Sequence, residues 1–172
     1  MPQEKKATTT PAPAPTGVTK TLKSTALQIA SSQLGAAENP KGSNWGPAVQ
    51  KYLASVGINF PASWCMAFVY WCTDQAAKEM GVANPLFKTG GVLMQWQKVP
   101  AIMKHKAPQP GDIFIMDFGG GKGHTGFVTG VTGDRIQTIE GNSNDEGSRE
   151  GYEVCRKPGG RKIGSCVGFI RL

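Results

Sequence analysis

Two cysteines in the segment PASWCMAFVYWC carry the first candidate chemistry of this chain. Cys65 and Cys72 stand seven positions apart in a stretch whose apolar pattern predicts a buried helix. At 1.5 Å per residue they lie about 10.5 Å apart along the axis, whereas a disulfide needs Cα atoms within about 7 Å. Zinc is disfavoured as well, because no CxxC pair is present and the chain has only 2 histidines.

The positions of the two cysteines on this helix predict different roles. Cys65 falls in the first turn, where unsatisfied N–H groups and the positive end of the helix dipole stabilise a thiolate. It is therefore the candidate nucleophile, with an ordinary core cysteine as the alternative. Cys72 lies two turns deeper without such help, and we expect it to be a small buried apolar residue.

A cysteine nucleophile needs a base, which is most often a histidine. His105 lies in the basic, proline-bounded stretch MKHKAP and is expected to be solvated. His124 opens the alternating strand GHTGFVTGV after a glycine-rich turn, a fixed position that suits a base. The alternative is a structural strand histidine.

A third group should orient the imidazole through its other nitrogen. Glu140 and Asn142 lie at the end of the next strand, in DRIQTIEGNSND. A short turn between the two strands brings this end back beside His124. Because they are two positions apart, the pair could point the same way, with Glu140 orienting His124 and Asn142 supporting an oxyanion or the loop. A solvated turn is the alternative.

A second pair of cysteines, Cys155 and Cys166, brackets the turn-like segment KPGGRK. If Gly160 and Arg161 form the centre of the turn, the two cysteines face each other on antiparallel strands. Facing strand cysteines lie close enough for a bond, so we expect a disulfide in an oxidising compartment and two free thiols in the cytoplasm.

Two further segments resemble ligand sites without meeting their requirements. GGGKGH at 119–124 lacks the Ser or Thr of a phosphate loop and leads into a strand rather than a helix. NSNDEGSREGYE at 142–153 has the spacing of a calcium loop, but its first ligand is not Asp and strands flank it. We therefore expect no metal and no cofactor.

The elements that must position these residues fall into two groups. Helical periodicity and capping signals predict helices first, in the ranges 24–35, 47–57, 63–80 and 90–99. Period-two patterns then predict five strands, in the ranges 111–118, 123–133, 134–141, 149–155 and 162–172. This order predicts an α+β domain at 23–172, with helices packed on a five- to six-stranded antiparallel sheet. The Thr-, Pro- and Ala-rich residues 1–22 predict a disordered tail.

Four motifs in this order resemble the CHAP domain, the cysteine, histidine-dependent amidohydrolase/peptidase of the papain-like, NlpC-type clan. They are SWCMAFVYW, PGDIFIMDFGGGKGHTGFVTGV, IEGNSN and GFIRL, and the similarity extends over residues 24–172. The resemblance implies a papain-like fold. It places the nucleophile at Cys65, the base at His124 and the orienting acid at Glu140, with Asn142 assisting.

The resemblance also implies hydrolysis of peptidoglycan, at the N-acetylmuramoyl-L-alanine bond or at a peptide bond of the stem or cross-bridge. Some CHAP lysins bind calcium through an acidic loop before the nucleophile, but ASVGINFPASW holds no acid here. Trp45 and Trp64 could wall the substrate groove or belong to the core. Rival interpretations are a cysteine protease or transamidase acting on proteins, and a non-catalytic wall-binding module.

The formal net charge of +7 predicts an acidic partner, such as a carboxylate- and phosphate-rich bacterial envelope. The basic residues are scattered, which argues against nucleic acid. No apolar run approaches the roughly 20 residues that span a bilayer, and the N-terminus has no secretory signal. We expect export by another route to the periplasm or cell wall, as a phage lysin or as an effector with delivery machinery and an immunity protein.

Overall fold

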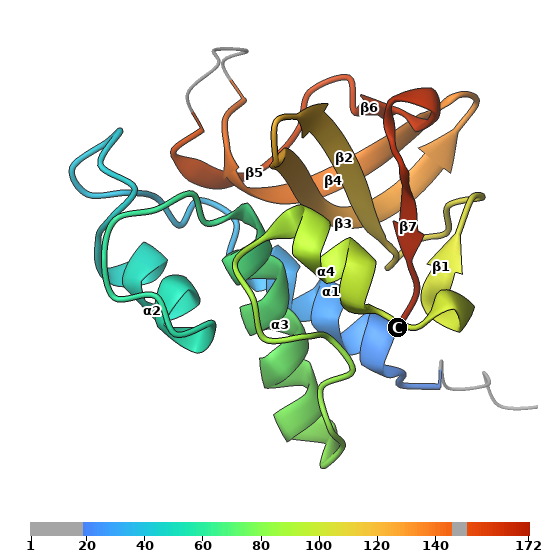
Figure 1. Ribbon diagram of the computed structural model, residues 1–172, viewed down its shortest axis with the longest axis horizontal. Coiled ribbons are helices and arrows are strands. Elements are labelled where there is room, and N and C mark those ends of the chain that lie inside the picture. The colour runs from blue at the N-terminus through green and yellow to red at the C-terminus, as the bar shows by residue number, and fades with distance from the viewer. Residues whose placement is uncertain (1–18, 146–150) are drawn as a thin grey trace, which may run out of the picture.

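The computed structural model describes residues 19–145 and 151–172 (Figure 1). Most of the tail expected at 1–22 lies outside the described residues, as does part of the calcium-like segment at 142–153. The first helix begins at Leu22, two residues earlier than its periodicity predicts, because Thr21 caps it and exchanges hydrogen bonds with Ser24. None of the described helices is long and apolar enough to cross a membrane.

In the part of the chain that the structure describes, four helices come first and gather on one side of the sheet (Figure 1). Their bounds are α1 Leu22–Ser32, α2 Pro47–Ser55, α3 Cys65–Met80 and α4 Val92–Lys98. Proline at the first position of α2 and a left-handed Gly81 after α3 start and stop these helices as the sequence predicts. Short 3₁₀ turns follow at Ala101–Met103 and Ile163–Ser165.

The strands of the described residues form one antiparallel sheet of seven members, which confirms the α+β fold and adds two strands of two residues each to the expected five. Their order is β1-β7-β2-β3-β4-β5, and β6 pairs with β4. Their bounds are β1 Lys104–His105, β2 Ile113–Gly119, β3 Lys122–Thr132, β4 Arg135–Ser143, β5 Glu153–Arg156, β6 Arg161–Lys162 and β7 Gly168–Ile170. His105, expected in a solvated loop, instead pairs with Phe169 of β7 and lies 3.3 Å from the Arg171 guanidinium.

The hydrophobic core lies between the sheet and α3, which is buried along most of its length. Phe68 of α3 meets Phe127 of β3 edge to face, with ring centroids 6.3 Å apart. Cys72 is fully buried in this core, as its position predicts, and burial raises the pKa of its thiol well above the usual value. This packing, together with the contact of Phe68 with Gly141, fixes the first turn of α3 against the middle of β3 and the end of β4.

The hairpin expected between Cys155 and Cys166 is not formed, which corrects the basis of the predicted disulfide. Both β5 and β6 run antiparallel to β4 and pair with successive parts of it. Residues 157–160 therefore loop out between these two pairings, and the chain does not reverse direction there. Cys155 is opposite Glu140 of β4, whereas Cys166 follows a 3₁₀ turn. Both thiols are free, and burial raises the pKa of each to about 11.

Candidate active site

The nucleophile candidate occupies the first position of a long buried helix. Trp64 is the N-cap residue of α3, and Cys65 is its first helical residue. The cap is therefore one position later than the Ser63 that the sequence favours, and no side chain caps the helix. Cys65 is 5% exposed, so its sulfur is sheltered from bulk water at the positive end of a helix of 16 residues.

The base candidate lies on β3, beside the first turn of α3. His124 is opposite Met116 of β2, and its side chain is 12% exposed. The Cys65 side chain lies close enough to the His124 imidazole to raise its pKa. Because Nε2 of this ring binds Glu140, Nδ1 is the nitrogen left to face the sulfur. The structure therefore brings together the two residues whose separation in sequence is 59 positions.

The orienting acid candidate meets the other side of the same ring. Nε2 of His124 lies 2.7 Å from Oε2 of Glu140, whose side chain is fully buried. Gly126 makes this contact possible, since a Cβ there would come 3.0 Å from Cγ of Glu140 and 2.6 Å from the Ile139 carbonyl oxygen. The glycine on β3 thus leaves room for the carboxylate to cross from β4 to the imidazole.

The environment of His124 favours its charged form. Burial acts to lower the pKa of the imidazole, but the hydrogen bonds and charges of Cys65 and Glu140 outweigh it and raise the pKa from 6.5 to about 9. At neutral pH the ring is therefore an imidazolium between a thiol group and a carboxylate. A histidine held in this way beside a cysteine is the arrangement that nucleophilic cysteine catalysis uses.

Arg161 completes the surroundings of Glu140, and sequence reasoning missed it. Its Nε donates to Oε1 at 2.9 Å and its Nη2 donates to Oε2 at 2.6 Å. The hydroxyls of Thr138 and Ser143 donate to the same carboxylate at 2.7 and 3.0 Å. Together with His124, these groups satisfy a buried charge that would otherwise be costly.

These contacts also fix the charge of Glu140. Burial acts to raise its pKa, but the hydrogen bonds and charges of Arg161 and His124 hold the pKa far below its ordinary value. The carboxylate is therefore ionised throughout the neutral range. It can orient the imidazole without competing for its proton.

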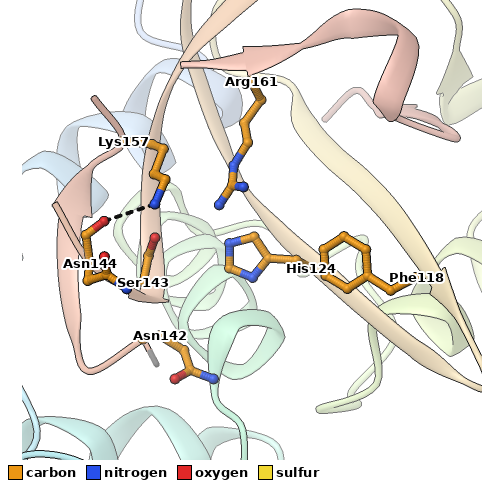
Figure 2. A pocket seen from close by; sticks show the side chains of 8 residues that line it. Phe118, His124, Asn142, Ser143, Asn144, Lys157 and Arg161 are labelled. Atoms are coloured by element: carbon orange, nitrogen blue, oxygen red, sulfur yellow. Dashed lines mark hydrogen bonds between the residues drawn. The ribbon is translucent and has the colours of Figure 1, made fainter. Parts of the chain in front are cut away.

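Asn142 does not share the orientation of Glu140 that a regular strand would give it. The pairing of β4 with β5 shifts between Glu140 and Ser143, and Asn142 has a φ of 52°, so a bulge interrupts the alternation. Asn142 instead lines the hollow beside the imidazole, and Figure 2 shows its amide below the His124 ring. The bulge thus places Asn142 at the edge of this hollow instead of beside Glu140.

Trp64 and Trp45 do not form the expected groove walls around this site. Trp64 is fully buried in the core, where its ring stacks on Tyr52 and its Nε1 donates to the Glu38 carboxylate at 2.9 Å. The groove role predicted for Trp64 is therefore wrong. Trp45 is half-buried and lines a separate hollow with Ile58 and the end of α2. Neither side chain lines the hollow that contains His124.

A hollow of about 460 Å³ opens at the imidazole and is lined by residues of β2, β3, β4 and the β5–β6 path. Figure 2 shows the His124 ring at its centre, with Phe118 on one side and the Arg161 guanidinium above. Lys157 and Ser143 lie across the hollow from Phe118. Among the described residues, no group of three or more His, Cys, Asp or Glu side chains is arranged to hold a metal.

The sequence model of the CHAP domain matches residues 56–142, just over half of the chain. The chain belongs to the CHAP family. CHAP domains are in general cysteine- and histidine-dependent amidohydrolases or peptidases, and the matched range contains Cys65, His124 and Glu140. No curated protein and no solved structure shows a significant match.

The CHAP match ends before two of the groups that hold Glu140. Ser143 follows the last matched residue, and Arg161 lies 19 positions beyond it. Only a weak signal pointed to Arg161, namely a basic residue directly after a glycine turn. Its partner could not be inferred, because the pairing of β6 with β4 depends on the excursion at 157–160.

Proposed function

We propose that this CHAP protein hydrolyses an amide bond of peptidoglycan, either N-acetylmuramoyl-L-alanine or a peptide bond in the stem or cross-bridge. The observation that supports it is the line of three groups Cys65, His124 and Glu140, with the imidazole charged between the other two. The net charge of +7 suits a wall rich in carboxylates and phosphates. It predicts activity that falls as salt is added.

In the first proposed step the Cys65 thiolate attacks the carbonyl carbon of the scissile amide. A C–S bond forms, and the oxyanion accepts hydrogen bonds from the backbone N–H of Cys65 and from a neighbouring donor, for which Asn142 is the candidate. His124 then gives its proton to the amide nitrogen. The C–N bond breaks, the amine leaves, and an acyl thioester remains on Cys65.

In the second proposed step water hydrolyses the thioester. Neutral His124 takes a proton from the water, whose oxygen attacks the same carbon. The C–S bond breaks, the acid product leaves, and the thiolate–imidazolium pair is restored. Glu140 keeps its charge throughout and holds the ring so that Nδ1 faces the sulfur.

The proposed setting is the periplasm or the cell wall, reached as a phage lysin or as a delivered antibacterial effector. An effector would require an immunity protein in the producing cell. The charge and the CHAP family support a wall substrate, whereas a protein substrate for a protease or transamidase is the rival that product analysis separates.

The deciding experiment digests purified cell wall with the full-length protein and identifies the released muropeptides by mass spectrometry. A single type of cut amide bond supports the proposal and fixes its class. Cys65→Ser should lose nearly all release, because a hydroxyl is a poor replacement for a thiolate at this position. Cys72→Ser is the matched control and should retain most of the activity of each folded molecule. Release by Cys65→Ser at the wild-type rate would refute the mechanism.

A further inference from the structure

The hollow beside His124 lies on one side of the reacting groups. His124 lines it, whereas Cys65 does not. In amide hydrolysis by this arrangement, the histidine must deliver its proton to the departing nitrogen, so the amine fragment has to lie next to the imidazole. A space lined by the base and not by the nucleophile is therefore placed for the leaving side of the substrate.

Among the described residues, the charged side chains that line this hollow are all basic. Lys157, Arg161 and His124 line it, and no acidic side chain is among the described lining residues. Glu140 lies beneath with no exposed surface, and its oxygens already accept from Arg161, His124 and two hydroxyls. The described lining residues thus present positive charge to the hollow, and an anionic group would be attracted into it.

Lys157 is the group best placed to meet such an anion. Its side chain is half-buried, and its Nζ donates to the backbone carbonyl of Asn144 at 3.2 Å, which holds the ammonium at the wall opposite Phe118 (Figure 2). A lysine has three N–H donors, so two can donate to a ligand. Arg161, in contrast, is committed through Nε and Nη2 to Glu140.

We propose that this hollow binds the amine-side fragment of the substrate and that Lys157 selects fragments with a free carboxylate on their first or second residue. The inference rests on the proposed hydrolysis and names the feature of the substrate that the site recognises. The exposed ring of Phe118, 60% accessible, offers an apolar wall for the side chain of the same fragment. The carboxylate itself takes no part in bond breaking.

Two matched pairs of amine fragments test the proposal without turnover. Alanine and alaninamide differ in the carboxylate of the first residue; Ala-Glu-amide and Ala-Gln-amide differ in that of the second. Their binding to full-length Cys65→Ala is measured by NMR titration. We expect the carboxylate member of one pair to bind roughly tenfold more tightly, as a charge-assisted hydrogen bond predicts. The pair that shows the difference identifies which residue of the amine fragment carries the carboxylate that Lys157 binds.

The same titrations on Cys65→Ala/Lys157→Met should reduce the preference to less than about twofold, while the amide fragments bind as before. Lys162→Met in the same background is the matched control, because Lys162 is exposed on β6 and does not line the hollow. It should keep the preference. Equal binding within both pairs, no binding of any fragment, or an undiminished preference in the Lys157 variant would overturn the inference.

These results remain distinguishable from those on the hydrolase itself. If wild-type protein releases muropeptides but the fragments show no carboxylate preference, the proposed function stands and the carboxylate site does not. If no muropeptide is released, the hydrolase proposal fails, and a carboxylate preference lost in the Lys157 variant would then describe a binding site without turnover.

Discussion

The guanidinium group of Arg161 binds both carboxylate oxygens of Glu140, with Nε 2.9 Å from Oε1 and Nη2 2.6 Å from Oε2. Glu140 has no exposed surface, and Oε2 also contacts Nε2 of His124 at 2.7 Å. Arg161 therefore acts on the His124 ring through Glu140. It is a positioning residue. Its two N–H donors hold the plane of the Glu140 carboxylate, and this carboxylate in turn holds the His124 ring.

Removing these paired guanidinium donors should lower the stability of the fold in a pH-dependent way. Arg161→Gln leaves a buried carboxylate with less compensation, so we expect the free energy of unfolding at pH 7 to fall by about 3 kcal/mol. The contribution of a carboxylate with a lowered pKa is present above about pH 4.5 and is lost as the pH falls below it. The difference from wild type should therefore shrink by pH 3, as measured by urea unfolding.

The conservative variant separates charge from geometry at this position. Arg161→Lys keeps the positive charge but loses the paired donors, so it should recover part of the stability and show kcat reduced about tenfold with little change in KM. Arg156→Gln, an exposed neighbour on β5, is the control and should alter neither quantity. A stability loss of equal size at pH 7 and pH 3 would instead indicate a packing role for Arg161.

The alkaline limit of activity should follow the charge of His124. Its pKa is raised to about 9, so the imidazolium persists until the pH approaches 9. Its contribution to stability is complete below about pH 6.5 and is lost as the pH rises through 9. We expect kcat/KM to fall by half near pH 9. Glu140→Gln removes one of the two groups that raise this pKa and should shift the limit to lower pH by about one unit or more.

Asp134→Asn provides the control for the loss of a carboxylate, because Asp134 is exposed in the turn between β3 and β4. It should leave the pH profile unchanged. Direct titration of the His124 ring by NMR in Cys65→Ala should show a pKa below 9, since the sulfur contributes to the shift. An alkaline limit that is the same in Glu140→Gln and in wild type would disprove the coupling.

A second buried acidic residue, Glu38, binds the side chain of Trp64, which directly precedes the nucleophile. Oε1 of Glu38 accepts from the Trp64 indole at 2.9 Å, whereas Oε2 is buried without a hydrogen-bond partner in the described residues. Glu38→Ala should cost about 1–3 kcal/mol, because the indole N–H loses its acceptor in the core. Glu38→Gln keeps an acceptor and should retain most of the stability. Thermal unfolding of the two variants, compared with wild type, distinguishes these cases.

The fold could be read from the sequence because its signals are local. The proline and glycine limits of α2 and α3 and the alternation in β2 to β4 depend on neighbouring residues, and these elements are present in the structure. The strand expected at 162–172 is instead interrupted by the 3₁₀ turn at Ile163–Ser165. The short turn between β3 and β4 predicted that the end of β4 lies near the start of β3. The contact of Glu140 with His124 also depends on the register shift between Val128 and Gly130, which the turn does not fix.

The parts that could not be predicted depend on contacts between distant segments. The 157–160 excursion resembles a hairpin turn in sequence, and only the continued pairing of β6 with β4 shows that the chain does not reverse. That pairing places Arg161 at Glu140 and separates Cys155 from the strand partner expected for it. Trp64 was ambiguous for a similar reason, since its burial depends on Tyr52 and Glu38 from earlier segments.

The close approach of α3 to β4 at Gly141 gives a final prediction. A Cβ at this position would lie 2.8 Å from Phe68 and 2.8 Å from the Trp64 ring, so Gly141→Ala must push α3 and β4 apart. Because Cys65 follows Trp64 and Glu140 precedes Gly141, the same shift would separate the sulfur from the imidazole. We expect a loss of about 1–3 kcal/mol in unfolding free energy and a fall in kcat of at least tenfold. Gly164→Ala, where a Cβ meets nothing within 4 Å, should change neither, and full activity in folded Gly141→Ala would show that this contact does not position the reacting groups.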